Sequence, residues 1–160
     1  MIFIDTGAFL ARYIAEDGLH ARALAGWERP SQERIPAFTS SLVLSETFTL
    51  LARRAGYAFA AQRARRILDS EALTVLRPSE RHDREALVLF EKYADQGVSF
   101  TDCASFALMR HHRIKSAFAF DRHFVLAGFD LWPRLDGRDI GQGVAGHWSA
   151  CYNQDRECAP

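Results

Sequence analysis

The sequence predicts an α/β domain with a mainly parallel central sheet. Short apolar runs alternate along the chain with longer segments of helical periodicity, which is the pattern of repeated strand–helix units. Acidic residues end two of these runs, at Asp5 and Asp121, and parallel sheets place their binding sites beyond the carboxyl ends of the strands. At 160 residues and 48% apolar composition, the chain can form one domain with a substantial core.

The first half of the chain predicts one strand followed by helices. The opening apolar run ends at Asp5 and is typical of a buried strand. Residues 28–36 are polar and include two prolines, which predicts a loop, and Gly56 is a helix stop signal. The expected elements are a strand over residues 1–5 and helices over 6–13, from 17 onward, over 42–55 and over 59–68.

The second half predicts three strands and three helices. Ser79 and Asp83 are start signals for a helix that reaches about Ala94, and Gly97 breaks the pattern. The expected strands cover residues 73–76, 117–120 and 129–132, the last as an edge strand, and the expected helices cover 79–94, 102–112 and 124–127. Residues 1–140 are predicted to form the domain, and 141–160, where periodicity disappears, a disordered tail.

Composition narrows the classes of protein. The formal net charge is zero, so charge excess alone would not make the chain bind polyanions. Asp5 interrupts the first apolar run too early for a signal peptide, and no run is long enough to span a membrane. The three cysteines do not suggest a disulfide framework, so a cytoplasmic location is expected.

Four acidic residues stand where a soluble domain seldom places a charge. Asp5 and Asp121 close apolar runs, while Glu46 is the only charged residue between positions 42 and 51. Asp102 follows a short mixed run and begins a helix. Buried acids are costly unless they are paired or bind a metal, so these four predict a shared pocket.

Each acid also has a structural explanation. Asp5 and Asp102 could cap the helices that follow them. Asp121 could pair with Arg122 or His123, and Glu46 could belong to a thin polar stripe on its helix.

Considered together, the four acids predict a cation. Two unit charges about 4 Å apart repel by roughly 4 kcal/mol at an effective dielectric constant near 20, so clustered carboxylates stay ionised only if a cation neutralises them. Oxygen ligands favour Mg²⁺ or Mn²⁺ over zinc. Carboxylate-bound Mg²⁺ commonly activates water against phosphodiesters, which predicts a metal-dependent hydrolase.

At the four acids the sequence resembles the PIN-domain family, and within it the VapC-type ribonuclease toxins of bacterial toxin–antitoxin pairs. The resemblance covers residues 1 to about 135. The motifs, in order, are Ile-Asp5-Thr-Gly-Ala-Phe, Ser-Leu-Val-Leu-Ser-Glu46-Thr, Ser-Phe-Thr-Asp102-Cys-Ala-Ser-Phe and Ala-Phe-Ala-Phe-Asp121-Arg-His-Phe.

The resemblance implies a three-layer α/β/α sandwich and a Mg²⁺- or Mn²⁺-dependent endoribonuclease. The family's four acids map to Asp5, Glu46, Asp102 and Asp121. By the same resemblance, Asp5, Asp102 and Asp121 are the expected metal ligands, and all four are catalytic. In-line attack by water that the metal activates would leave a 5′-phosphate and a 3′-hydroxyl. The implied partners are an RNA substrate, an antitoxin protein and a second copy of the chain in a homodimer.

Further residues are expected to assist. Thr6 and Thr101 are supporting residues beside the acids. Arg53 lies on nearly the same helical face as Glu46, and it could contact phosphate. Arg110 and Arg113 belong to a basic patch that could contact the RNA backbone or simply favour a helix C-terminus.

Other readings of the motifs fit less well. Asp5-Thr6-Gly7 spells the aspartic protease signature, but those enzymes need an all-β fold and two copies of the triplet. Zinc at His147, Cys151 and Cys158 matches no standard spacing. The remaining alternative is a catalytically weak PIN-like module that binds RNA or protein, and cleavage assays with Mg²⁺ and Mn²⁺ would separate the two.

Overall fold

Five parallel strands form the centre of the computed structural model, which describes residues 1–132, except for the side chains of 29–31. The sheet order is β3-β2-β1-β4-β5, and the register places Phe3 of β1 beside Phe38 of β2 and Ala117 of β4. The strands are β1 (Ile2–Ile4), β2 (Ala37–Ser40), β3 (Leu73–Leu76), β4 (Ser116–Phe118) and β5 (Asp130–Trp132). The prediction of a mainly parallel sheet is confirmed, and β5 is an edge strand as expected.

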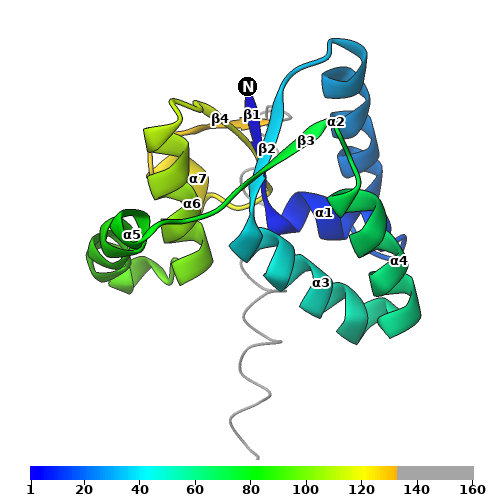
Figure 1. Ribbon diagram of the computed structural model, residues 1–160, viewed down its shortest axis with the longest axis horizontal. Coiled ribbons are helices and arrows are strands. Elements are labelled where there is room, and N and C mark those ends of the chain that lie inside the picture. The colour runs from blue at the N-terminus through cyan, green and yellow to red at the C-terminus, as the bar shows by residue number, and fades with distance from the viewer. Residues whose placement is uncertain (133–160) are drawn as a thin grey trace, which may run out of the picture.

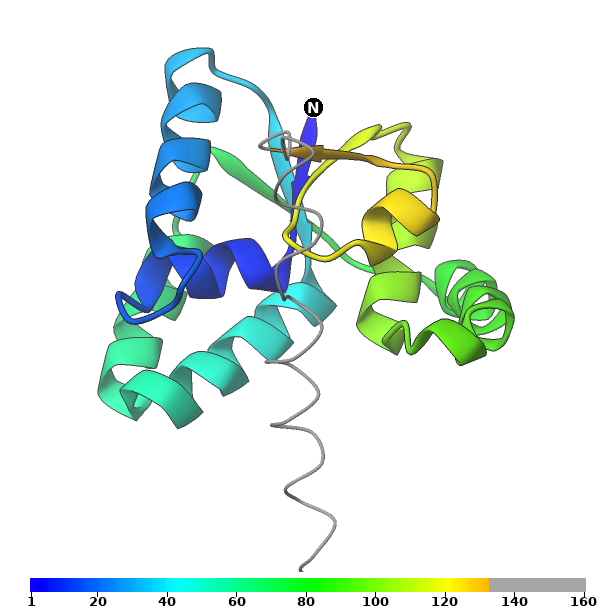
Figure 2. The ribbon, with the colours of Figure 1, turned by 180° about the vertical axis from the view of Figure 1, so that it is seen from behind.

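Helices cover both faces of the sheet, which confirms the α/β/α sandwich. In Figure 1, α1, α2 and α4 lie on one side of the strands and α5, α6 and α7 on the other, and Figure 2 shows the same layers from behind. Within the described residues, no helix is long and apolar enough to span a membrane. The helices are α1 (Thr6–Tyr13), α2 (His20–Gln32), α3 (Ser41–Ala55), α4 (Tyr57–Leu68), α5 (Glu80–Lys92), the 3₁₀ helix η1 (Ala94–Gln96), α6 (Phe100–His111) and α7 (His123–Leu126).

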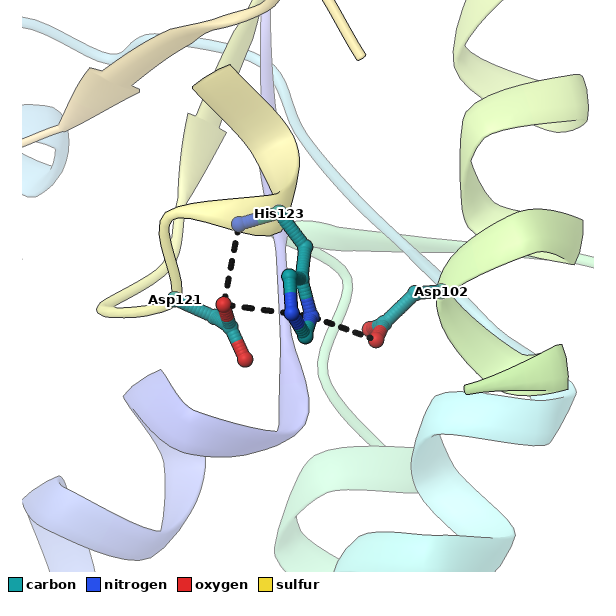
Figure 3. A group of neighbouring side chains, drawn as sticks. All are labelled: Asp102, Asp121 and His123. Atoms are coloured by element: carbon teal, nitrogen blue, oxygen red, sulfur yellow. Dashed lines mark hydrogen bonds and ion pairs between the residues drawn. The ribbon is translucent and has the colours of Figure 1, made fainter. Parts of the chain in front are cut away.

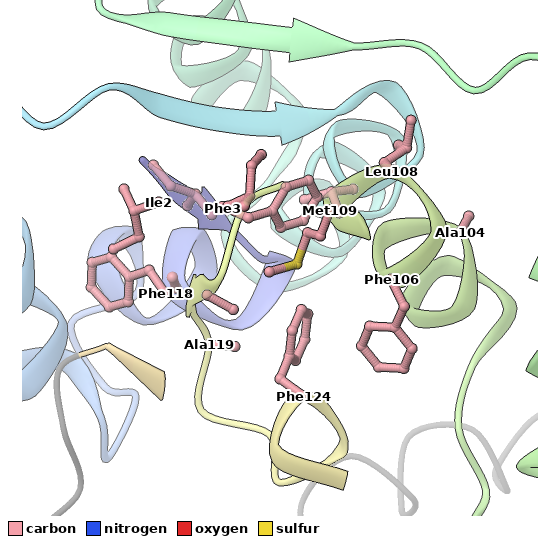
Figure 4. Close-up of a cluster of buried hydrophobic side chains, with 14 of the residues drawn as sticks. Ile2, Phe3, Ala104, Phe106, Leu108, Met109, Phe118, Ala119 and Phe124 are labelled. Atoms are coloured by element: carbon pink, nitrogen blue, oxygen red, sulfur yellow. The ribbon is translucent and has the colours of Figure 1, made fainter. Parts of the chain in front are cut away.

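Aromatic side chains form much of the core on both faces of the sheet (Figure 4). The indole of Trp27 on α2 packs between Phe9 and Phe118, with ring centroids 5.6 and 5.3 Å away. On the opposite face, Phe106 of α6 meets Phe124 of α7 at 5.1 Å. Burying one such side chain stabilises the fold by about 1.5–3 kcal/mol, so these contacts fix α6 and α7 against the sheet.

The loop predicted over residues 28–36 is wrong for its first part, because α2 continues to Gln32. Pro30 lies in the last turn of α2 and has no N–H to donate to the carbonyl of Gly26, four residues earlier. The indole Nε1 of Trp132 donates to that carbonyl instead, at 2.9 Å. A side chain from β5 therefore satisfies a group that proline leaves without its helical partner.

Strand β2 is not among the strands that the sequence predicts. Ser40 ends β2 and also caps α3, where its Oγ accepts a hydrogen bond from the Val43 amide at 3.1 Å. Thr39 Oγ1 donates to the Ile4 carbonyl of β1 at 2.8 Å. A strand that short, running directly into a helix cap, has no alternation that a sequence pattern can detect.

The other elements match their predicted positions to within two or three residues. Helix α6 begins at Phe100, two residues before its predicted start, because Ser99 is its cap. Helix α4 begins at Tyr57, and β4 covers 116–118. The predicted tail over residues 141–160, with His147, Cys151 and Cys158, lies outside the described residues, so the domain boundary near 140 stays a prediction.

Candidate active site

The four acids come from four segments that meet at the carboxyl edge of the sheet. Asp5 directly follows β1, and Asp121 lies three residues after the end of β4. Asp102 is in the first turn of α6, and Glu46 is in the second turn of α3, which begins where β2 ends. Because these strands are parallel, their carboxyl ends face one way, where α/β proteins form their sites.

Asp102 is the residue that links the other three acids. Its charge contributes to raising the pKa of both Asp5 and Glu46. Its Oδ2 lies 3.6 Å from Nδ1 of His123, which in turn lies 3.2 Å from Oδ1 of Asp121. The structure therefore brings the four acids into one cluster, hereafter the acid cluster.

Asp5 and Glu46 form the half of the acid cluster in which, among the described residues, hydrogen bonds rather than a positively charged group counteract the rise in pKa. Burial, followed by the charge of Asp102, raises the pKa of Asp5 well above its ordinary value, although the Gly7 amide donates to Oδ2 at 3.2 Å. Burial also raises the pKa of Glu46, and a 2.6 Å hydrogen bond from Thr6 Oγ1 to Oε2 partly offsets it. This half holds more negative charge than its surroundings neutralise.

Asp102, Asp121 and His123 form the other half (Figure 3). The His123 ring lies between the two carboxylates, and these contacts, with that to Asp102 foremost, raise the pKa of His123 to about 10. Burial alone would raise the pKa of Asp121, but His123 overcomes it and lowers that pKa. Although it contacts both carboxylates, Nδ1 is a buried atom without a well-directed hydrogen bond.

The structural explanations are correct for Asp5 and Asp121, whereas the N-cap of α6 is Ser99 and not Asp102. Asp5 caps α1, and Asp102 forms a capping box with Ser99, accepting from the Ser99 amide at 3.2 Å and donating its own amide to Ser99 Oγ at 3.0 Å. Asp121 Oδ1 accepts a hydrogen bond from the His123 amide at 2.9 Å. These backbone contacts hold the three carboxylates in place, so the same side chains stabilise the fold and form the acid cluster.

The predicted assisting residues lie at different distances from the acid cluster. Thr6 contacts Glu46 directly, and Thr101 precedes Asp102 on α6, where its carbonyl accepts from Ser105 Oγ. The predicted RNA contacts Arg53, Arg110 and Arg113 do not touch the cluster in the part of the chain that the structure describes: Arg53 is exposed beside the groove between α3 and α4, and Arg110 and Arg113 lie at the far end of α6.

His123 is the residue that the sequence reasoning did not include in the site. The sequence analysis includes it only as an ion-pair partner that would account for the position of Asp121 without a functional role. The signal was present in the spacing, because a histidine two residues after a strand-end acid can turn its ring back toward that edge of the sheet.

The donor groups suit a divalent cation. Asp102, Asp121 and His123 each offer one ligand atom, and these atoms lie within 4.8 Å of one another. Asp5 is not among these three, although it belonged to the predicted ligand set with Asp102 and Asp121. The raised pKa of Asp5 and the buried Nδ1 atom of His123 both indicate a place where a cation would relieve an unfavourable arrangement.

Comparisons with known proteins agree with this arrangement. The PIN domain family model matches residues 2–130. The chain is 36% identical over 129 residues to the 23S rRNA-specific endonuclease VapC20 of Mycobacterium tuberculosis, covering 81% of this chain and 95% of that protein. The crystal structure of VapC20, described as a Sarcin-Ricin loop cleaving toxin, superposes with a TM-score of 0.72 at 35% identity, over 81% of this chain and 96% of that one.

A more distant structure shares the fold alone. FitAcB from Neisseria gonorrhoeae has a TM-score of 0.61 at 16% identity, over 82% of this chain and 96% of that one.

The fold, the acid cluster and the family match together define the class of protein. The chain belongs to the PIN-domain family of nucleases. Within that family it is of the VapC type, as the sequence motifs predicted. The expectation of a metal-dependent endoribonuclease toxin is confirmed at the level of the family.

Proposed function

We propose that this enzyme cleaves a loop of 23S ribosomal RNA, with Mg²⁺ or Mn²⁺ as its cofactor. The observation that carries the proposal is the convergence of Asp5, Glu46, Asp102 and Asp121 at one edge of the sheet. The choice of RNA is supported by the 36% identity to a protein named for cleaving 23S rRNA.

The residues have separable roles in this proposal. Asp102 and Asp121, with Asp5 beside Asp102, hold the cation by carboxylate oxygens. When bound, the ion activates water and stabilises charge on the phosphodiester. Thr6 Oγ1 donates to Oε2 of Glu46, which leaves Oε1 to accept the proton of the attacking water. The raised pKa of Glu46 makes it a stronger proton acceptor than an ordinary glutamate.

Cleavage of this kind leaves a 5′-phosphate and a 3′-hydroxyl. Thr101 supports Asp102 from the preceding position on α6. Arg53, Arg110 and Arg113 contact the RNA backbone, and RNA that reaches Arg110 runs about 12 Å along α6 from Asp102.

The biological setting is also part of the proposal. An antitoxin protein holds the enzyme inactive by placing a basic side chain beside Asp5 and Glu46, where the negative charge is unbalanced. The chain acts as a homodimer in the cytoplasm, where ribosomes are found.

The test uses ribosomes and the full chain. Wild type, the Asp5→Asn/Asp102→Asn double variant and the control Asp95→Asn, which removes an exposed acid on η1, are incubated with Mg²⁺ or Mn²⁺. Primer extension should map one cleavage site in 23S rRNA for wild type and control, and the double variant should be slower on the order of 100-fold or more.

Two results would contradict the proposal. Metal-dependent cleavage retained by the double variant would remove the acid cluster from the chemistry. RNA binding without cleavage in either metal would favour the binding-module alternative. In cells, expression should arrest growth for wild type and not for Asp5→Ala.

A further inference from the structure

We propose that His123 is itself a metal ligand, so that the cation is held by one imidazole nitrogen together with carboxylate oxygens. This inference rests on the proposed function, because it concerns the cation of the same site. It goes beyond the four-acid pattern, which contains only oxygen ligands.

The backbone fixes where the His123 ring points. Its amide donates to Asp121 Oδ1 at 2.9 Å, so the residue is tied to one of the acids. The next residue, Phe124, is completely buried against Phe106 and anchors the start of α7. The His123 side chain is only 16% exposed and lies between Asp102 and Asp121 (Figure 3). The ring is therefore preorganised toward the acid cluster.

The Nδ1 atom has the surroundings of a ligand atom. It lies 3.2 Å from Asp121 Oδ1 and 3.6 Å from Asp102 Oδ2. Two atoms that each bind one ion at about 2.1 Å lie about 3.0 to 4.2 Å apart, so these separations need little adjustment. The arrangement already resembles one face of a coordination sphere.

The same atom has no other well-formed interaction in the described residues. Nδ1 of His123 is buried and makes no directed hydrogen bond to a protein group. Leaving a buried polar atom unsatisfied costs free energy, and a bound cation would remove that cost by taking the place of the ring proton.

A nitrogen ligand changes which divalent cation the site binds best. Mg²⁺ prefers oxygen ligands, whereas imidazole also suits Mn²⁺ and later transition metals. Substitution of His123 should therefore weaken Mn²⁺ binding more than Mg²⁺ binding.

The experiment observes the ligand directly and needs no RNA. Full-length protein loaded with Mn²⁺ is studied by electron spin echo envelope modulation, with natural-abundance and ¹⁵N-histidine-labelled samples. We expect modulation from directly bound nitrogen that changes on labelling, is retained in the control His112→Gln and is lost in His123→Gln. Calorimetry should show Mn²⁺ affinity reduced about tenfold or more by His123→Gln, with a smaller change for Mg²⁺.

The outcomes separate this inference from the proposed function. Bound Mn²⁺ without nitrogen modulation in wild type would overturn the role of His123 and leave the acid cluster as the metal site. Binding of Mg²⁺ without binding of Mn²⁺ would overturn the role of His123 alone, and binding of neither ion by wild type would overturn both. A wild-type spectrum without nitrogen modulation overturns the role of His123 even if His123→Gln does not fold.

Discussion

The two halves of the acid cluster differ in how the negative charge of their carboxylates is balanced. Around Asp121 the negative charge is balanced from within, by the His123 side chain, and the pKa of Asp121 is lowered. Around Asp5 and Glu46 it is not balanced, and the pKa of each is raised. Asp102 belongs to both halves. The metal-free protein is therefore stabilised at one side of its site and destabilised at the other.

The largest difference between the two halves is expected when one acid in each is neutralised. Asp5→Asn should raise the free energy of unfolding of the metal-free protein at pH 8 by about 1–2 kcal/mol, because it removes unbalanced charge and asparagine also caps helices. Asp121→Asn should lower it by up to about 1 kcal/mol, because it removes the partner of His123 from a partly exposed position. Urea unfolding in the presence of a chelator measures both.

Both variants should lose RNA cleavage. Asp5→Asn should therefore be more stable than wild type and yet inactive. Asp95→Asn is the matched control, since that acid is exposed on η1 and is not one of the four acids of the cluster. Two shifts of the same sign would show that the halves are electrostatically alike.

A smaller effect tests the hydrogen bond inside the unbalanced half. Thr6→Val keeps the side-chain shape but removes the donor to Glu46 Oε2, which leaves a partly buried acid without its partner. The free energy of unfolding should fall by about 1 kcal/mol, and the pKa of Glu46 should rise further. Thr6→Ser retains the hydroxyl and should retain most of the stability. Urea unfolding and carboxyl titration by NMR provide the measurements, and equal stability of the valine and serine variants would contradict the expectation.

A further test is a pH dependence that belongs to the balanced half. The folded-state pKa of His123, about 10, is above the ordinary value of 6.5. Its charged form therefore contributes stability fully below about pH 6.5, and this contribution is lost as the pH rises through about 10. In metal-free protein, the melting temperature of wild type should fall more steeply between pH 7 and 10 than that of His123→Gln. Parallel curves would show that the His123 charge does not stabilise the fold.

The acids and most elements could be predicted because their signals are local. Asp5 and Asp121 end apolar runs, and Glu46 stands alone in one, so each is visible without knowledge of the fold. Parallel strand order then follows from strand–helix alternation, which places strand ends at one edge.

What could not be predicted depends on contacts between distant segments. The end of α2 is compatible with proline because Trp132, 106 residues after Gly26, donates to the Gly26 carbonyl. Strand β2 exists because β1 and β3 pair with it on either side, and its four residues carry no pattern of their own. His123 lies beside Asp102 because Phe124 of α7 packs against Phe106 of α6. A pattern of acidic residues cannot reveal a histidine at such a site.

Three carboxylates of the acid cluster also accept hydrogen bonds from backbone amides, and this second role has an evolutionary consequence. Asp5, Asp102 and Asp121 each bind backbone amides through an oxygen that asparagine also possesses. An aspartate codon becomes an asparagine codon by one nucleotide change, so the chemistry can disappear while the architecture persists. A copy of this chain with the same fold and without its chemistry is therefore one nucleotide change away.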